Sequence, residues 1–201
     1  MPVIRPYRPA DRAALDDVCV RTAHNGQDAR PHYRDPGILP ELFAAPYAHL
    51  EPRYAFVLAD EDDRPVGYVV GTGDTARFVK RFRDEWLPPL ARRYPPLDGE
   101  PDGPDELMRK LLHWPERMIV PELAGYPAHL HIDLLPDHQR RGYGRLLMAR
   151  LADALREDGV PALHLGMVTE NTAARAFYDR IGLHPIEVAD AGPLTYLGLR
   201  L

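Results

Sequence analysis

A glycine-containing loop in the C-terminal half of the chain connects an apolar strand to an amphipathic helix, and it narrows the choice of fold more than any other segment. The loop reads PDHQRRGYGR from Pro136 to Arg145 and follows the run AHLHIDLL at 128–135. Pro136 has no N–H for a neighbouring strand, so the strand ends there. Gly142 and Gly144 omit side chains where a backbone must approach a ligand, and the helix beginning there presents free N–H groups and a positive dipole end. The segment predicts a binding site for a phosphate or pyrophosphate.

This loop differs from two common phosphate-binding loops. No Gly-Lys-Ser/Thr follows it, which excludes a Walker loop, and the spacing Gly-x-Gly-x-x-Gly of a dinucleotide fingerprint is absent. The pattern Gln/Arg-x-x-Gly-x-Gly/Ala alone would occur by chance in roughly one 200-residue chain in five. Its surroundings supply the specificity, because the helix after it carries one apolar face, formed by Leu147, Leu151, Ala154 and Leu155. That face predicts packing on a sheet.

The order of the other predicted elements indicates an α/β fold with a mixed central sheet flanked by helices. From Ala128 the order is strand to 135, helix 144–156, strand 162–168, helix 172–181 and a last strand of alternating leucines that ends at Leu201. The segments before it are predicted as a strand at 3–7, a helix capped by Asp11, a short helix at 39–45, and a hairpin of 54–59 with 66–72. We therefore predict one α/β domain over residues 1–201.

A helical segment interrupted by prolines, over about 74–126, separates the hairpin from the strand at 128. Its Pro-Pro pairs and Pro/Gly/Asp run divide it into short pieces, so we interpret it as an insertion. Phe78, Phe82 and Trp86 recur every four residues and predict an aromatic stripe. We expect the stripe to pack the insertion onto the core; the alternative is a lid over a substrate site.

Composition excludes several classes of partner. The formal net charge of -5 argues against non-specific nucleic-acid binding, and no run of ~18 apolar residues exists to span a membrane. The N-terminus has no secretory signal pattern, and the lone Cys19 cannot form an internal disulfide. We expect a cytoplasmic protein without nucleic-acid or membrane partners, and the sequence assigns no oligomeric state.

A second motif follows the strand at 162–168 and opens the next helix. Its characteristic residues are Asn171, Ala174, Phe177 and Tyr178. Together with the loop at 139–144, this motif resembles the GNAT acetyltransferases, in which the loop binds the pyrophosphate of acetyl-CoA and the helix flanks the pantetheine and thioester. The resemblance implies a GNAT fold, with a helical insertion before the cofactor-binding strand, and acetyl-CoA as cosubstrate.

The resemblance extends over nearly the whole chain to one group of such domains. The segments that carry it are Ile4-Arg5-Pro6, the hairpin at 54–58 with Gly67-Tyr68, Phe78-Val79-Lys80-Arg81 with Trp86, and Ile132-Asp133. They look like the acetyltransferase-like C-terminal domain of O-GlcNAcases. The chain has no room for a glycoside hydrolase domain, so we expect a stand-alone bacterial relative. The loop is degenerate in the animal domain, whereas Gln139 to Gly144 is intact here.

The resemblance also implies which residues contact acetyl-CoA. The pyrophosphate loop comprises Gln139, Arg140, Arg141, Gly142, Tyr143, Gly144 and Arg145. Backbone groups of Leu134 and Leu135 would line the pantetheine arm, and Asn171, Ala174 and Phe177 would flank it. Asn171 can also cap the helix that follows it.

Acetyl transfer to an amine needs a neutral amine, a polarised carbonyl and a proton for the departing thiolate. A lysine amine with a pKa near 10.4 is only ~0.1% neutral at pH 7.4, so a base is required. The resemblance places Tyr178 near the sulfur as general acid; the alternative is a core tyrosine. Asp133 matches the carboxylate proposed as catalytic in the O-GlcNAcase domain and is the leading base. His131, with an ordinary pKa near 6.5, is the second choice.

His129, His131 and Asp133 alternate and share one strand face. They lack a spaced partner motif, so we expect a polar face and no metal site. A second acidic position of the O-GlcNAcase domain falls at Asn171, which cannot take a proton. We predict an acetyl-CoA-dependent N-acetyltransferase that acts on a small amine or a protein or peptide. The alternative is a non-catalytic acyl-CoA-binding pseudo-acetyltransferase that acts by interaction.

Overall fold

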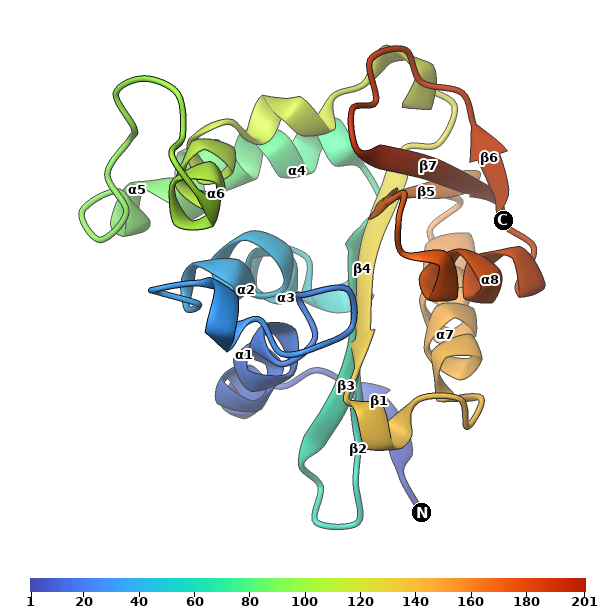
Figure 1. Cartoon of the computed structure of the whole chain (residues 1–201). Coiled ribbons are helices and arrows are strands. Elements are labelled where there is room, and N and C mark those ends of the chain that lie inside the picture. Colours follow the sequence, from blue (N-terminus) through green and yellow to red (C-terminus); the bar gives the residue numbers. More distant parts are fainter.

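A computed structural model describes all 201 residues, and a seven-stranded mixed sheet forms its centre (Figure 1). The strands are β1 (Val3–Pro6), β2 (Ala55–Ala59), β3 (Pro65–Thr72), β4 (Ala128–Leu134), β5 (Ala162–Val168), β6 (His184–Ile186) and β7 (Leu194–Arg200). They lie in the order β1-β2-β3-β4-β5-β7-β6. Every neighbouring pair is antiparallel except β4 and β5, which are parallel. The predicted mixed α/β sheet is confirmed.

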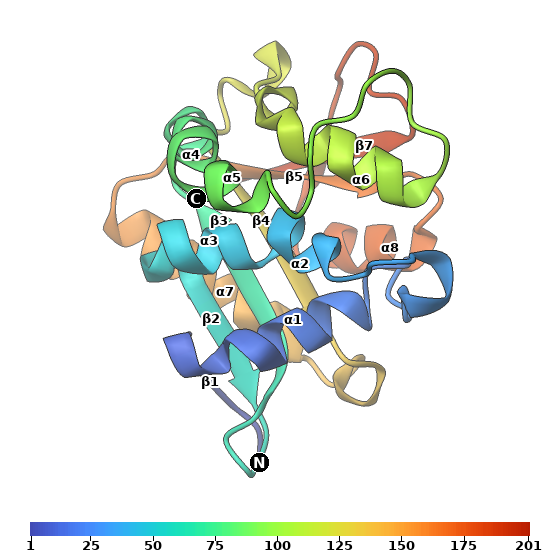
Figure 2. The same ribbon diagram turned by 90° about the vertical axis from the view of Figure 1, so that its left-hand side faces the viewer.

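Helices cover both faces of this sheet (Figures 1 and 2). One face carries α1 (Arg12–Val20), α2 (Ile38–Phe43), α3 (Ala45–Leu50), α4 (Thr75–Arg81), α5 (Leu87–Leu90) and α6 (Pro104–His113). The opposite face carries α7 (Tyr143–Glu157) and α8 (Thr172–Arg180). No helix has both the length and the apolar composition to cross a membrane.

Two apolar clusters, one on each face, hold these layers together. The first cluster packs the helices α1 through α6 against the sheet and includes the buried Leu15, Val18 and Cys19 of α1. The second joins α7 to the other face through the predicted stripe of Leu147, Leu151, Ala154 and Leu155, which are all fully buried. Burying a leucine side chain contributes about 1.5–3 kcal/mol relative to leaving it exposed, so this stripe fixes α7 on the sheet.

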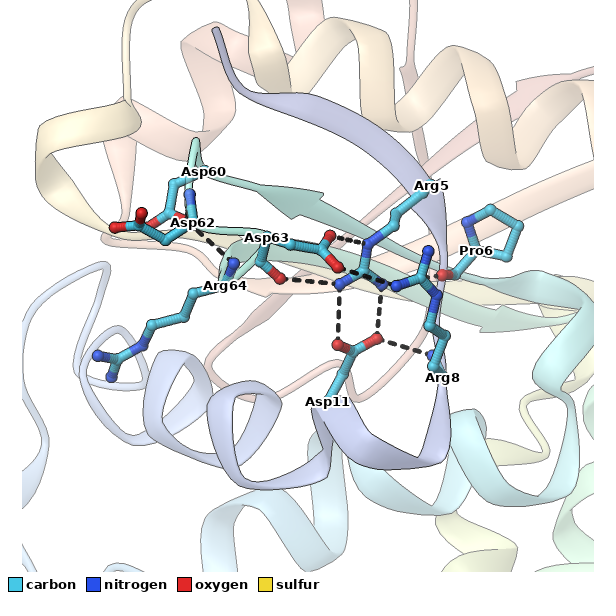
Figure 3. A network of polar contacts seen from close by, with 8 residues as sticks. All are labelled: Arg5, Pro6, Arg8, Asp11, Asp60, Asp62, Asp63 and Arg64. Carbon is cyan, nitrogen blue, oxygen red and sulfur yellow. Dashed lines mark hydrogen bonds and ion pairs between the residues drawn. The ribbon is translucent and has the colours of Figure 1, made fainter.

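An arginine-centred network ties β1 to α1 and to the turn between β2 and β3 (Figure 3). The Arg5 guanidinium donates to Asp11 at 2.7 and 2.9 Å and to Asp63 at 2.6 Å, and Arg8 donates to Asp63 at 2.9 Å. Asp11 occupies the N-cap position of α1, as expected, but its carboxylate bonds Arg5 and the Arg8 N–H rather than a helix N–H. Burial opposes its ionisation, but the Arg5 hydrogen bonds prevail and lower the pKa of Asp11.

The structure differs from the sequence prediction in two short regions. In place of one helix at 39–45, two helices meet at Ala44, whose φ of -136° interrupts the helical path. Pro40 and Pro46 lie in the first turns of these helices, where a missing N–H has no cost, rather than at their boundaries. The strand β6, with only three residues, was not predicted.

The insertion is helical, as predicted, and its aromatic stripe packs onto the core. Phe78 and Phe82 are buried in the cluster that holds α1 to α3. Trp86 is half-buried, and its indole N–H donates to the carbonyl of Glu41 at 3.0 Å. These contacts confirm that the stripe attaches the insertion to the helical layer. The segment between α6 and β4 returns to the sheet through a 3-10 helix at Pro115–Met118.

Candidate active site

The parallel strands β4 and β5 pair over only two residues and then separate. Their register is Ala128 with Leu163 and His129 with His164, although β4 runs on to Leu134. Beyond His129, β4 keeps its pairing with β3 on one side but has no strand on the other. Figure 1 shows β5 and β7 turned away from the length of β4. The sheet is therefore open along most of β4.

The open edge of β4 presents backbone groups of Ile132 and Leu134. The Leu135 N–H donates to the carbonyl of Val66 at 2.9 Å. The backbone N–H and C=O groups of odd-numbered residues in this strand therefore point toward β3, and those of even-numbered residues point toward the gap. The Leu134 carbonyl accepts from the Gln139 side chain at 2.9 Å. The expectation for Leu135 needs correction, because its N–H bonds Val66 and its carbonyl accepts from His138. The backbone groups that face the gap are those of Ile132 and the Leu134 N–H.

The loop after β4 presents free backbone N–H groups at the end of this gap. The backbone N–H groups from Arg140 through Arg145 have no acceptor within the protein. Arg140 and Gly142 have positive φ angles of 58° and 84°. Such an alternation turns successive N–H groups to one side and forms a nest, and the N-terminus of α7 adds its partial positive charge. The side chains of Arg140, Arg141 and Arg145 are exposed and form no ion pair.

The two glycines of the loop have different structural roles. Gly142 is the N-cap of α7 and needs its positive φ, which a side chain would strain. A Cβ on Gly144 would lie 3.1 Å from the Phe177 ring and 3.7 Å from Leu134. A glycine at position 144 is thus also required by packing within the protein. It lets α7 pack against Phe177 of α8 and brings the two predicted motifs together.

Helix α8 begins beside the opening with a side-chain cap. The Asn171 side-chain oxygen accepts from the Ala174 N–H at 3.1 Å, which leaves the amide NH₂ free. Further along, Phe177 and Tyr178 pack against the cluster under α7. The Tyr178 hydroxyl has no hydrogen-bond partner in the protein and is not sealed from solvent. Burial, together with the charge of Asp133, raises the pKa of Tyr178, so the phenol keeps its proton at neutral pH.

Asp133 lies on β4, on the face that α1 covers. It pairs in register with Tyr68 of β3, whose hydroxyl donates to its carboxylate at 2.6 Å. Burial raises the pKa of Asp133 to about 6, and the Tyr68 hydrogen bond opposes that shift. A pKa near 6 leaves the carboxylate mostly ionised at pH 7 and strengthens it as a base relative to an ordinary aspartate. The charge of Asp133 also contributes to the raised pKa of Tyr178.

The two histidines of β4 have unequal surroundings. Both ring nitrogens of His129 are occupied, by Tyr47 at 2.8 Å and Thr75 at 2.7 Å, so this histidine is structural. His131 contacts the rings of Phe43 and Tyr47. Burial and the charge of Arg117 lower the pKa of His131 to about 4, so its expected value near 6.5 does not apply. No three His, Cys, Asp or Glu side chains converge closely enough to hold a metal ion.

The sequence model of the acetyltransferase (GNAT) family matches residues 27–183. This range covers most of the chain and includes the open strand, the nest and α8. The chain belongs to the GNAT acetyltransferase family. Its mixed sheet, with a helical insertion before the cofactor-binding strand, is therefore the GNAT fold. Acetyl-CoA is the acyl donor of this family of acyltransferases.

Individual relatives confirm the resemblance to the O-GlcNAcase domain. Protein O-GlcNAcase of Rattus norvegicus is 25% identical over 192 residues, which cover 94% of this chain and 21% of that protein. This GNAT chain thus spans about a fifth of the length of those curated relatives. The crystal structure of SsHAT has 62% identity and a TM-score of 0.96, and the match covers 99% of this chain and 98% of that one. The PaiA N-acetyltransferase of Thermoplasma acidophilum, in complex with coenzyme A, shares the fold at 12% identity, with a TM-score of 0.61 over 100% of this chain and 99% of that one.

Two residues of this GNAT site were missed by sequence reasoning. Tyr68, which bonds Asp133, lies within a predicted strand, but only the register of β3 with β4 brings the two together. Arg117 lies in the insertion and acts on His131 from about fourteen residues upstream of it. The only indication in the sequence was the alternation of His129, His131 and Asp133 on β4, because three polar side chains on one strand face need polar partners.

Proposed function

We propose that this protein transfers the acetyl group of acetyl-CoA to an amine, with Asp133 as general base and Tyr178 as general acid. One observation supports the proposal: free N–H groups gather at the end of a strand edge that has no partner, and the charge of Asp133 on that strand acts on Tyr178 of α8. This arrangement suits a long ligand with an anionic end and a reactive end. The matched family uses such a ligand.

The nest is suited to the pyrophosphate of acetyl-CoA. Free N–H groups from Arg140 to Arg145, the dipole of α7 and three unpaired arginines supply positive potential without any competing carboxylate in an ion pair. The pantetheine amides would then lie against the Ile132 and Leu134 backbone. They would use the hydrogen-bonding positions that β5 leaves vacant, as an added strand would. The free amide NH₂ of Asn171 lies at the start of α8, on the other side of this path.

The proposed reaction begins with a proton on the amine. Asp133 accepts this proton, and the neutral amine attacks the thioester carbonyl. The C–N bond forms, the C–S bond breaks, and Tyr178 donates its phenolic proton to the departing sulfur. The attacking nitrogen loses its second proton as the C–S bond breaks, and through solvent this proton replaces the one that Tyr178 gave to the sulfur. Asp133 releases the first proton to solvent, so the products are an amide, free coenzyme A and one proton.

Asp133 is a better candidate base than His131. Both groups are deprotonated at pH 7, but the pKa of Asp133 is about 6 whereas that of His131 is about 4. Proton acceptance follows basicity, so the carboxylate is the stronger acceptor. Arg117 and burial together make His131 a neutral, weakly basic side chain.

The proposal is tested by charge reversal in the nest. Arg140→Glu and Arg141→Glu should each weaken acetyl-CoA binding about tenfold or more, as measured by calorimetry, because each removes a charge-assisted contact and adds repulsion. Arg180→Glu is the matched control, since Arg180 is exposed at the end of α8 and has no ion pair. Unchanged affinity in both nest variants would remove the basis for the cofactor site.

A thiol-release assay over a panel of amines and peptides tests the transfer step. We expect coenzyme A release to depend on both acetyl-CoA and the amine. Tight acetyl-CoA binding without amine-dependent release would contradict the transfer and support the non-catalytic acyl-CoA binder, in which the absence of an acid at Asn171 marks lost chemistry.

A further inference from the structure

Arg117 is unusual among the arginines of this chain. Arginine supplies nearly all the positive charge, since Lys80 and Lys110 are the only lysines. The arginine side chains that make neither an ion pair nor a hydrogen bond are Arg34, Arg92, Arg117, Arg140, Arg141, Arg145, Arg150 and Arg180. All of them are exposed except Arg117 and Arg150, and Arg150 stacks on the Phe56 ring at 4.4 Å. Arg117 alone is largely buried without any partner.

The insertion holds Arg117 against the face of β4 that carries the proposed base. Arg117 lies in the 3-10 helix Pro115–Met118, and the Met118 sulfur accepts from the Tyr47 hydroxyl at 3.8 Å. That hydroxyl is 2.8 Å from His129, and the Tyr47 ring is 5.1 Å from the His131 ring. This chain of contacts places the 3-10 helix over the part of β4 that carries His129 and His131.

The charge of Arg117 is not neutralised by the protein. It interacts electrostatically with Tyr47, His129, His131 and Tyr196, and none of these is a carboxylate. Its guanidinium nitrogens are not sealed, because the only buried side-chain N or O atoms without a partner belong to Glu41 and His138. A largely buried guanidinium without a counter-ion is costly, and one that stays accessible is available to an anion from solution.

We propose that Arg117 binds an anionic group of the acceptor, so that the acceptor is an amine that also carries a carboxylate or a phosphate. This inference rests on the proposed transfer reaction, because it takes the amine to be held at Asp133. The side chains of His131 and Asp133 share one strand face two residues apart, which is about 7 Å. An acceptor whose amine lies at Asp133 and whose anionic group lies beyond His131 would need several bonds between the two.

The test compares acceptors that differ only in the anionic group. The probes are 5-aminopentanoate against pentylamine, and O-phosphoethanolamine against ethanolamine, which separate a carboxylate from a phosphate. In at least one of these pairs, the kcat/KM of the wild type for the acceptor with the anionic group should be at least about tenfold above that for the acceptor without it. Arg117→Gln should lower the ratio of kcat/KM for the anionic acceptor to that for the uncharged one about ten- to a hundredfold, because a hydrogen bond to a charged group is lost.

Two controls separate a binding role from a folding role. Arg92→Gln removes an exposed, unpartnered arginine of the same insertion and should keep the preference for anionic acceptors. Acetyl-CoA affinity should be the same in the wild type and in Arg117→Gln, and Arg117→Lys, which keeps the charge, should retain part of the preference. If the variants do not fold, the wild type alone still decides, since equal kcat/KM for both members of each probe pair contradicts the inference.

Failure of the proposed reaction gives a different result. With coenzyme A bound, calorimetry with 5-aminopentanoate and O-phosphoethanolamine measures anion binding without turnover. Binding that Arg117→Gln weakens supports the anion site even where no amine is acetylated. Turnover of all four amines with no dependence on Arg117 leaves the transfer reaction intact and overturns the anion site. No binding of either anionic probe and no preference in turnover also overturns it.

Discussion

Replacing Asp133 by asparagine should stabilise this protein at neutral pH. The carboxylate lies between β3 and α1 with one protein hydrogen bond from Tyr68, and burial raises its pKa to about 6 from an ordinary 3.8. A raised pKa means that the folded state holds the proton more tightly than the unfolded chain. Ionisation at pH 7 therefore costs stability. Asparagine has nearly the same shape, carries no charge and still offers an oxygen to the Tyr68 hydroxyl.

The size and sign of the effect follow from linkage between protonation and folding. A shift of about 2 pH units corresponds to about 3 kcal/mol. Below pH 4 the carboxyl is protonated in both states, and the penalty is absent. Between pH 4 and pH 6 the folded state binds more protons than the unfolded state, so the stability of the wild type falls as the pH rises. Above pH 6 the full penalty remains, and Asp133→Asn should exceed the wild type by up to about 3 kcal/mol.

Denaturant unfolding of both proteins from pH 4 to pH 8 measures this difference directly. For a chain of this length, about 3 kcal/mol corresponds to a rise in Tm of about 6–12 °C at pH 7.5. Asp137→Asn is the control, because Asp137 is exposed four residues further along the chain. A difference between the wild type and Asp133→Asn that stays constant from pH 4 to pH 8 would refute the raised pKa, and with it the argument for Asp133 as the stronger base.

Two further substitutions test separate parts of the site. Tyr178→Phe should lower kcat about 10²- to 10⁴-fold and change acetyl-CoA affinity less than twofold, because only a proton donor is removed; unchanged kcat in the thiol-release assay would assign Tyr178 to packing. Gly144→Ala should cost about 1–3 kcal/mol in thermal unfolding, since its Cβ would lie 3.1 Å from Phe177, whereas Gly125→Ala meets no atom closer than 3.6 Å and should change Tm little; equal Tm values would contradict the close packing of α7 on α8.

The parts of the fold that could be predicted are those with a long periodic pattern. The apolar stripe of α7 repeats over about two and a half turns, and the alternation on β4 marks both its faces, so each element follows from its own residues. Short elements lack this redundancy. The two helices at Ile38–Phe43 and Ala45–Leu50 have six residues each, and their separation depends on one residue, Ala44. The strand β6 gains its structure from pairing with β7 rather than from its own sequence.

The candidate site was predicted where its function rests on backbone conformation. The glycines and the proline of the loop after β4 indicate its turn and the start of α7 from local chemistry alone. The opening of the sheet depends on the residue at which β5 stops pairing with β4, and no residue of either strand indicates that point in the sequence. Tyr68 and Arg117 reach β4 from distant segments, so their roles depend on register and on the path of the insertion. Even Gly144, found from the motif, serves a contact with Phe177 that only the packed helices reveal.

Two charged side chains of this site, Arg117 and Asp133, have no oppositely charged partner in the protein. Most arginines of the chain are paired or exposed, yet Arg117 is held in the layer above β4 without a counter-ion, and Asp133 on the same face has only a neutral hydroxyl. Neither group shifts the pKa of the other, and the two form no ion pair, so they stand apart on this face. Kept apart along the strand, they match a ligand that carries an ammonium at one end and an anion at the other. The stability lost at Asp133 and at Arg117 is then recovered when such an acceptor binds, and this links the stability measurement on Asp133→Asn to the acceptor preference that Arg117 controls.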